Sequence, residues 1–299
     1  MRAGEPAQLQ LWLPRGLAVL AAALFGLGLV MWVAANWDDF GRPGRFALLQ
    51  AALLVGALTA AAKPPWRAPA ALLALLATGT LFAYFGQTYQ TGADTWQLFA
   101  LWATLSLPLA WAAHSDVVWA PWAVVATMAV AFWVQTHTGH RWRVEAGDLA
   151  VHVTGFGLLL MLCVSLSQPL ARWTGAGLWA WRTAALLAVA VLLVAALGGL
   201  FSSPVRPQYA LGSVVLAVAA GVSAAHRRFF DVFVLSAVAL GLDTLLVAGL
   251  ARWLFDGRSR GGDPIMELLL IGGAAAVLLA LSVQQVMRLA RRSADEVPL

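Results

Sequence analysis

The sequence is poor in charged residues. Aspartate, glutamate, lysine and arginine together make up 11% of its 299 residues, whereas soluble globular proteins contain roughly 25%. Hydrophobic residues make up 61% of the chain, and its mean hydropathy is +0.79. So few charged groups cannot cover the surface of a water-soluble domain. These values therefore exclude an ordinary soluble protein and indicate that lipid surrounds most of the chain.

Cysteine and lysine are almost absent, and so are the motifs of common enzymes. Cys163 is the only cysteine, which excludes an intrachain disulfide and a cysteine-based metal cluster. Lys63 is the only lysine and lies in a turn beside two prolines. The chain contains no Gly-x-Ser-x-Gly, no His-Glu-x-x-His and no phosphate-binding Gly-x-x-x-x-Gly-Lys segment. We therefore assign no catalytic residue and no cofactor, and an enzyme is the least favoured function class.

The connection near residue 140 carries several residue types that can bind a metal. It contains His137, His140, Glu145 and Asp148, and His152 follows at the start of the next apolar run. Imidazole and carboxylate groups bind zinc in many proteins. The spacing here, however, matches no established zinc motif. We therefore predict no metal site.

The chain carries a net charge of +5, but its basic residues form no stripe or patch. They are scattered through the short connections between apolar runs, which is the arrangement of loop charges that face lipid headgroups. A nucleic-acid partner is therefore not expected. Membrane lipid is the predicted partner, and membrane-protein partners or a homo-oligomer remain open.

Ten apolar runs reach or approach the length that crosses a bilayer. A spanning helix needs about 20 mainly apolar residues, because each residue advances a helix by about 1.5 Å through roughly 30 Å of hydrocarbon. Backbone polar groups in hydrocarbon must bond within the segment, which favours helices. We therefore predict an all-α, polytopic integral membrane bundle of about ten helices. The predicted spans are Gly16–Ala35, Gly44–Ala62, Ala68–Gly86, Trp96–Ala113, Val117–Thr136, Leu149–Ser167, Leu178–Phe201, Tyr209–Ala225, Phe229–Leu250 and Pro264–Met287.

The ten spans divide into two sets of five. We expect an N-terminal membrane domain over residues 1–136, a C-terminal membrane domain over residues 137–287, and a basic then acidic tail over residues 288–299. With the N-terminus inside, eleven of the lysine and arginine residues fall on the cytoplasmic side and eight on the other. The three arginines of the tail favour the same orientation. The expected location is a bacterial inner membrane, with both termini in the cytoplasm.

Two polar motifs follow the first and third predicted spans. The first reads Ala34-Ala-Asn-Trp-Asp-Asp-Phe40, and the second reads Phe85-Gly-Gln-Thr-Tyr-Gln-Thr-Gly-Ala-Asp-Thr-Trp96. This order resembles a family of bacterial predicted membrane proteins, domain of unknown function 2157. That family has an Asn-Trp pair after its first helix and a Gln-x-Tyr-x-x-x-Gly-Asp-like segment, then a Trp, after a later one; here Ala93 separates the glycine from the aspartate. The resemblance covers about residues 10–135, and it implies a membrane protein without implying an activity.

Both motifs follow odd-numbered spans, so the topology places them on one membrane face. That face is periplasmic if the N-terminus is inside. We predict a polar site there, in which carboxylates, amides and aromatic rings bind a cation, a sugar or a peptide. The alternative is that Asn36 and Gln87 cap helix ends while Trp37 and Trp96 anchor the lipid interface. The predicted site residues are Asn36, Trp37, Asp38, Asp39, Gln87, Tyr89, Asp94 and Trp96.

Asp243 lies near the middle of the predicted span Phe229–Leu250. A carboxylate at this depth costs on the order of 3 kcal/mol on insertion scales, so we expect it to face the bundle interior, either protonated or paired. A path for protons or cations would use Asp243 as its carrier. The alternative is a protonated, hydrogen-bonded packing residue with Thr244 nearby.

Two function classes follow from these features. The first expectation is a transporter or permease-like protein with a polar site on its periplasmic face, favoured by Asp243, and the second class is its alternative. A non-transporting partner or assembly protein of an envelope complex is favoured by the scarcity of charge within the spans. A water-filled cavity that reaches Asp243 would support the first class. A dry core with an exposed apolar groove would support the second.

Overall fold

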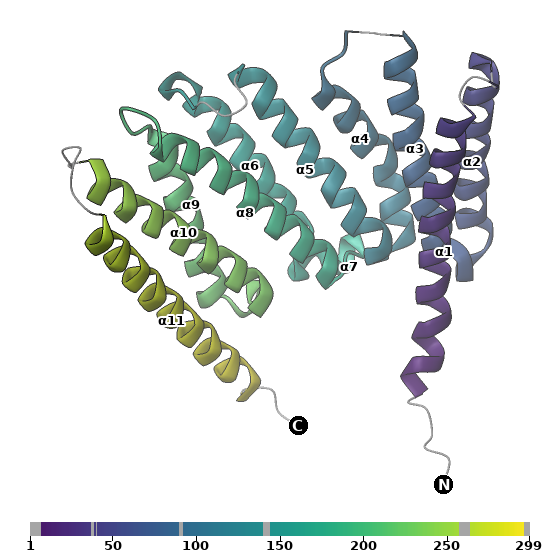
Figure 1. Cartoon of the computed structure of the whole chain (residues 1–299). Helices are drawn as coiled ribbons and strands as arrows, with labels where there is room; N and C mark the ends of the chain where they lie inside the picture. The colour runs from purple at the N-terminus through teal and green to yellow at the C-terminus, as the bar shows by residue number, and fades with distance from the viewer. Residues whose placement is uncertain are drawn as a thin grey trace. The chain divides into compact units, whose positions relative to one another are not determined.

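The protein is built from helices. The computed structural model describes residues 7–36, 39, 41–89, 92–139, 144–256 and 264–295. Within these ranges every regular element is a helix, as Figure 1 shows. The predicted all-α class is therefore confirmed for this part of the chain.

Short connections and 3₁₀ turns join the α-helices. The 3₁₀ turns are Pro64–Trp66, Ala146–Asp148, Gln168–Leu170 and Arg227–Phe229. The α-helices are α1 (Ala7–Ala35), α2 (Arg42–Ala62), α3 (Arg67–Tyr89), α4 (Thr95–Ala113), α5 (Asp116–Thr138), α6 (Leu149–Ser165), α7 (Ala171–Thr174), α8 (Leu178–Leu200), α9 (Pro207–Ala225), α10 (Val232–Asp256) and α11 (Ile265–Asp295).

Among the described residues, nine helices are long and apolar enough to cross a membrane, namely all except α4 and α7. Each of the nine coincides with one of the ten predicted spans. The tenth predicted span, Trp96–Ala113, forms α4, which has 19 residues. Its length is therefore sufficient, but Gln97 and three tryptophans lower its hydropathy. The predicted polytopic membrane bundle is confirmed.

Helix α11 extends beyond the predicted end of the last span. It continues from Ile265 to Asp295 and so includes the arginine-rich part of the predicted tail. No glycine or proline interrupts residues 274–295, so nothing in the local sequence ends the helix at the membrane surface. The first part of the tail is therefore helical.

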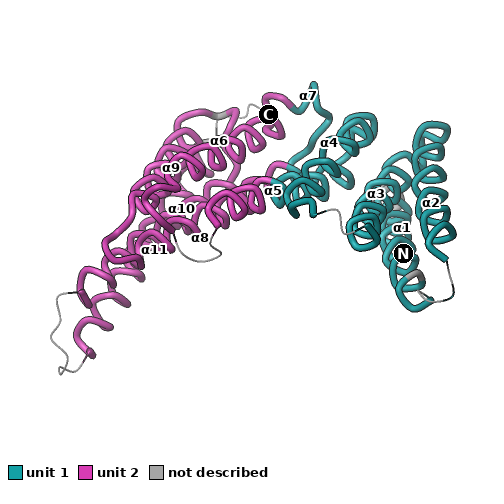
Figure 2. The backbone as a smooth tube through the Cα atoms, turned by 90° about the horizontal axis from the view of Figure 1, so that it is seen from above, with its two compact units in different colours: residues 1–129, 171–180 teal, residues 130–170, 181–299 magenta. Residues whose placement is uncertain are grey.

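The described helices form two compact units, which Figure 2 colours separately. Unit 1 consists of residues 1–129 and 171–180, and unit 2 consists of residues 130–170 and 181–299. Helices α5 and α8 each contribute residues to both units. The expected domain boundary at residue 136 remains a prediction, because a compact unit is not by itself a domain that folds alone.

In unit 1, α3 packs against α1, α2 and α4 (Figure 1). Glycines allow the close approaches. A Cβ atom at Gly56 of α2 would lie 2.9 Å from the Ala70 carbonyl oxygen of α3. A Cβ atom at Gly79 would lie 2.2 Å from the Trp102 ring, whose Nε1–H donates to the Leu75 carbonyl oxygen at 2.9 Å. Such close contact is a main source of helix association in lipid, where the hydrophobic effect between helices is absent.

A carboxylate at the start of α5 holds the start of α8 within unit 1. Asp116 Oδ1 accepts a hydrogen bond from Gly177 N at 2.6 Å, and its Oδ2 accepts one from Trp179 N at 2.9 Å. Trp119 Nε1 also donates to the Thr174 carbonyl oxygen at 2.9 Å. A carboxylate at a helix N-terminus satisfies unpaired N–H groups and is attracted by the helix dipole. Asp116 therefore has a structural role.

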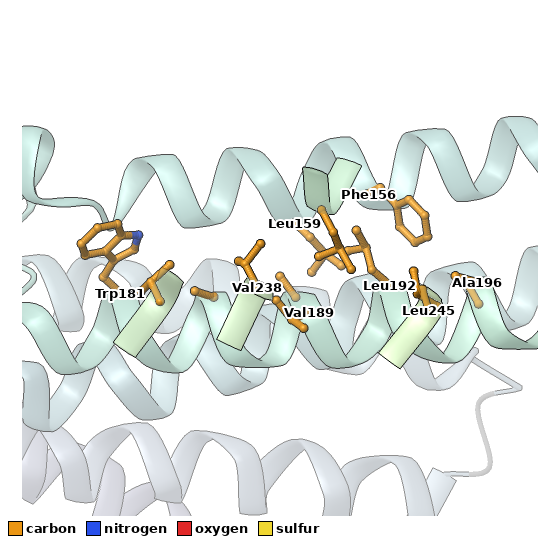
Figure 3. Packing of buried hydrophobic residues seen from close by; sticks show 13 residues of the cluster. Phe156, Leu159, Trp181, Val189, Leu192, Ala196, Val238 and Leu245 are labelled. Atoms are coloured by element: carbon orange, nitrogen blue, oxygen red, sulfur yellow. The ribbon is translucent and has the colours of Figure 1, made fainter. Parts of the chain in front are cut away.

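The core of unit 2 is formed by apolar side chains from α6, α8, α9 and α10. Figure 3 shows Phe156 and Leu159 of α6 facing Leu192 of α8. Glycine again permits the contact between helices, because a Cβ atom at Gly241 of α10 would lie 2.9 Å from Val189 Cγ1 of α8. This part of the unit is therefore a dry, closely packed core.

We expect Gly79→Ala to destabilise unit 1, because the new methyl group would displace the Trp102 ring and break its hydrogen bond to α3. Overpacking of this kind costs about 1–3 kcal/mol, so the thermal unfolding midpoint of the detergent-purified protein should fall. Gly157→Ala is the control, because a Cβ atom there meets nothing within 4 Å. Its midpoint should stay equal or rise with helix propensity. Equal midpoints for the two variants would contradict the described packing.

Candidate functional site at the ends of helices α1 to α4

The predicted polar site falls at four helix ends of unit 1. Helix α1 ends at Ala35, α2 begins at Arg42, α3 ends at Tyr89 and α4 begins at Thr95. The start of α2 and the end of α3 lie side by side, since the Phe46 ring centroid is 5.9 Å from that of Tyr89. Trp37 and Asp38 lie outside the described residues.

Asn36 acts on its own helix. Its Nδ2 donates to the Trp32 carbonyl oxygen at 2.9 Å, and its own carbonyl oxygen accepts from Asp39 N at 3.2 Å. The Trp32 carbonyl oxygen also accepts a hydrogen bond from Asn36 N at 3.0 Å, so the side-chain bond reinforces the last turn of α1. This bond fits the capping alternative, and a ligand-binding role for Asn36 remains a prediction.

The remaining predicted residues lie around the α3–α4 connection. Gln87 and Tyr89 are exposed in the last turn of α3, and Asp94 is exposed at the N-cap position of α4. The Asp94 side chain makes no capping hydrogen bond, so its carboxylate is available to water or to a ligand. Trp96 is half-buried in the first turn of α4. Ligand binding by this set remains a prediction.

The structure adds residues to this face that the sequence reading did not identify. The Phe46 ring lies 4.7 Å from the Tyr84 ring, and the Phe85 ring lies 4.8 Å from the Tyr89 ring, measured between centroids. Arg45 precedes Phe46 and is only 9% exposed. In the sequence, Arg42 and Arg45 are two arginines of one basic segment. Nothing in the residue type or in the spacing predicts that Arg45 is buried while Arg42 is exposed. Burial of a cation beside aromatic rings depends on how α2 packs on α3.

Asp243 lies in α10 about 17 Å along the helix from Val232, at 1.5 Å per residue. Its Oδ2 atom is buried and has no hydrogen-bond partner among the described residues. The Thr244 hydroxyl donates to the Leu240 carbonyl oxygen at 2.7 Å, so that hydroxyl is committed to its own helix. The expectation that Asp243 is protonated or paired remains a prediction.

Asp231 has a different environment. Arg182 Nη2 donates to Asp231 Oδ2 at 2.7 Å, and Val234 N donates to Asp231 Oδ1 at 3.0 Å. Asp231 therefore caps the N-terminus of α10 and ties it to α8. This carboxylate is fully engaged in structure and is not available as a second carrier for Asp243.

Most polar side chains inside the spans bond to the backbone of their own helix. Thr78 donates to the Ala74 carbonyl oxygen at 2.8 Å, and Ser106 donates to the Trp102 carbonyl oxygen at 2.6 Å. Such bonds satisfy a hydroxyl in hydrocarbon without a neighbouring polar group. These hydroxyls therefore build no polar path between helices.

Helix α1 carries an open apolar hollow. Gly26 faces α3, because a Cβ atom there would lie 3.2 Å from Leu76 Cδ1, whereas a Cβ atom at Gly28 would meet nothing within 4 Å. The two glycines thus lie on different faces of the same helix. The residues that line the hollow are Leu24, Phe25, Gly28, Leu29 and Trp32.

Metal ligands do not gather in the part of the chain that the structure describes. No three His, Cys, Asp or Glu side chains of these residues lie where they would hold a metal ion. His137 Nδ1 faces the Trp133 carbonyl oxygen at 2.8 Å, and His140 lies outside the described residues.

Comparison with known proteins identifies the segment that carries these helix ends. Residues 2–119 match the family of predicted membrane proteins called domain of unknown function 2157. The resemblance predicted from the two polar motifs is thus confirmed. The domain 2157 match contains α1 to α4 and stops within α5, so it includes every described residue of the candidate site. No curated protein and no solved structure matches the chain.

We expect Arg45→Gln to lower the thermal midpoint of the domain 2157 segment. The substitution removes a buried cation and leaves its former surroundings unpaired, which typically costs about 1–3 kcal/mol. Arg42→Gln is the matched control, because Arg42 is exposed in the same turn and its loss should change stability by less than about 0.5 kcal/mol. Unfolding followed by intrinsic tryptophan fluorescence measures both. A loss at Arg42 as large as that at Arg45 would contradict the assigned burial.

Proposed function

We propose that the protein is a membrane-embedded assembly protein, which binds a transmembrane helix of a partner protein through α1 and transports no solute. The apolar hollow around Gly28 carries this proposal. Gly28 exposes bare backbone between larger apolar side chains, and helices in lipid approach most closely at such positions. The occupant is therefore a helix of matching apolar character.

Two further observations support this reading. Most of α1 is unburied, with Leu24, Phe25 and Met31 at 59%, 64% and 70% exposure. Apolar side chains of α6, α8, α9 and α10 form the buried cluster of unit 2, and the span hydroxyls described above bond to their own helices. A closely packed apolar core in unit 2 and an exposed apolar groove on α1 are together the combination expected of a partner protein.

Transport is the second candidate function. It is favoured by Asp243 alone, whose Oδ2 atom is buried without a hydrogen-bond partner in the described part of the chain. Intramembrane carboxylates are expensive and commonly functional. In a transporter, Asp243 would exchange a proton or bind a cation during each cycle.

Complementation of a gene deletion separates the two functions. We expect Gly28→Leu to fill the hollow and abolish complementation, while Asp243→Asn retains it. Gly157→Leu is the matched control, because it adds the same side chain at an equally open helical position. Each variant is compared at equal abundance in the membrane fraction. Loss of complementation in Asp243→Asn together with full activity of Gly28→Leu would establish the transport reading instead.

We further propose that the protein lies in a bacterial inner membrane with both termini in the cytoplasm. This orientation requires α4 to cross the bilayer, and its 19 residues give about 28 Å at 1.5 Å per residue. In a Cys163→Ser background, a membrane-impermeant thiol reagent should label Asp94→Cys in intact spheroplasts. Ser115→Cys should react only after permeabilisation. Labelling of both cysteines from outside would show that α4 does not cross.

A further inference from the structure

Two connections of unit 2 are joined at a single carbonyl group. The Glu145 carbonyl oxygen accepts hydrogen bonds from Asp148 N at 3.2 Å and from Gln208 Nε2 at 2.6 Å. Asp148 is the N-cap of α6, and Gln208 lies in the first turn of α9. The connection before α6 and the start of α9 therefore share one hydrogen-bonded junction.

Gln208 leaves an oxygen without a partner at this junction. Its side chain is 0% exposed, and the bond from Nε2 to a carbonyl oxygen fixes the orientation of the amide, because only the nitrogen can donate. The Oε1 atom is consequently an acceptor, and it is buried without a hydrogen-bond partner among the described residues. Buried acceptors are nearly always satisfied in native proteins, so this atom requires a ligand.

Asp148, whose backbone N–H bonds to the same Glu145 carbonyl oxygen, carries a second unpartnered oxygen. Asp148 Oδ2 is buried and likewise lacks a hydrogen-bond partner among the residues described. His152, which is 4% exposed, turns its Nδ1 towards the Asp148 carbonyl oxygen at 2.9 Å and not towards the carboxylate. The carboxylate therefore receives no donor from the next turn of α6.

We propose that Asp148 Oδ2 and Gln208 Oε1 bind one sodium ion. Both unpartnered atoms are hard oxygen ligands, one anionic and one neutral, and hard cations prefer carboxylate, carbonyl and water oxygens. One carboxylate matches a single positive charge. The ion would tie the start of α6 to the start of α9 in unit 2, which is a structural role independent of the function proposed for α1.

Among the described residues, Arg206 is a cationic group close in sequence to this site. It is the N-cap of α9, two residues before Gln208, and its Nε atom is buried without a described partner. Its positive charge opposes a bound cation and would favour a bound anion. Arg206 therefore provides a test of the charge of the ligand.

Thermal unfolding in sodium chloride against choline chloride, at constant ionic strength, tests the proposal on the full-length protein in detergent. Sodium should raise the midpoint in a saturable way, because a ligand that binds only the folded state stabilises it. Asp148→Asn should increase the half-maximal sodium concentration about tenfold or more, and Arg206→Gln should decrease it. Glu145→Gln, an exposed carboxylate in the same connection, is the matched control and should leave it unchanged.

Equal midpoints in sodium and choline would overturn the proposal and leave water as the occupant of the junction. A shift for Glu145→Gln as large as that for Asp148→Asn would also overturn it, because a general surface-charge effect would then explain the result. If Asp148→Asn does not fold, sodium NMR decides the matter on the wild-type protein. A sodium signal that the protein broadens relative to the same sodium-containing detergent buffer without protein supports the site, and an unbroadened signal rejects it.

Discussion

The whole structure depends on the need to satisfy backbone polar groups in hydrocarbon. Chargeless runs of about 20 residues are stable in lipid only as helices, because each N–H and C=O must bond within its own segment. Once they are helical, apolar faces no longer drive them together, and contact depends on how closely two backbones approach. Gly56, Gly79 and Gly241 provide these approaches, since a Cβ atom at each would lie within 3 Å of a neighbouring helix.

Because of the same constraint, many of the polar side chains that bond to another helix or connection lie at helix ends. Asp116 caps the start of α8, Asp231 caps α10, and Gln208 joins the start of α9 to the connection before α6. These groups replace the water that would otherwise satisfy the first N–H groups of a helix. These polar residues therefore have a structural role, because each hydrogen-bonds the end of one helix to another segment. Asp243 and Thr127 differ, because a side-chain oxygen of each is buried in mid-helix without a described partner.

The sequence predicted the parts of the fold that depend on local composition. Length and hydropathy located the spanning helices, and the Asn36 and Gln87 motifs pointed to the family that matches residues 2–119. It did not predict the burial of Arg45, the ring cluster around Phe46, or the bonds from Asp116 to Gly177 sixty-one residues later. These features depend on which helices become neighbours, and the apolar periodicity of a membrane helix carries little of that information. Asp243 could be singled out beforehand, because the free-energy cost of its carboxylate is set by its depth in the span.

We propose that the helices of unit 2 enclose a dry interior and that the protein acts by binding a partner helix at α1. Hydrogen–deuterium exchange of the protein in lipid nanodiscs tests this claim most directly, because amide exchange in a span requires water or local opening. The account predicts unbroken protection along α8 and along α10, including the turns on either side of Asp243. Fast exchange confined to the turn around Asp243, with the rest of α10 protected, would reveal a water path and contradict the account.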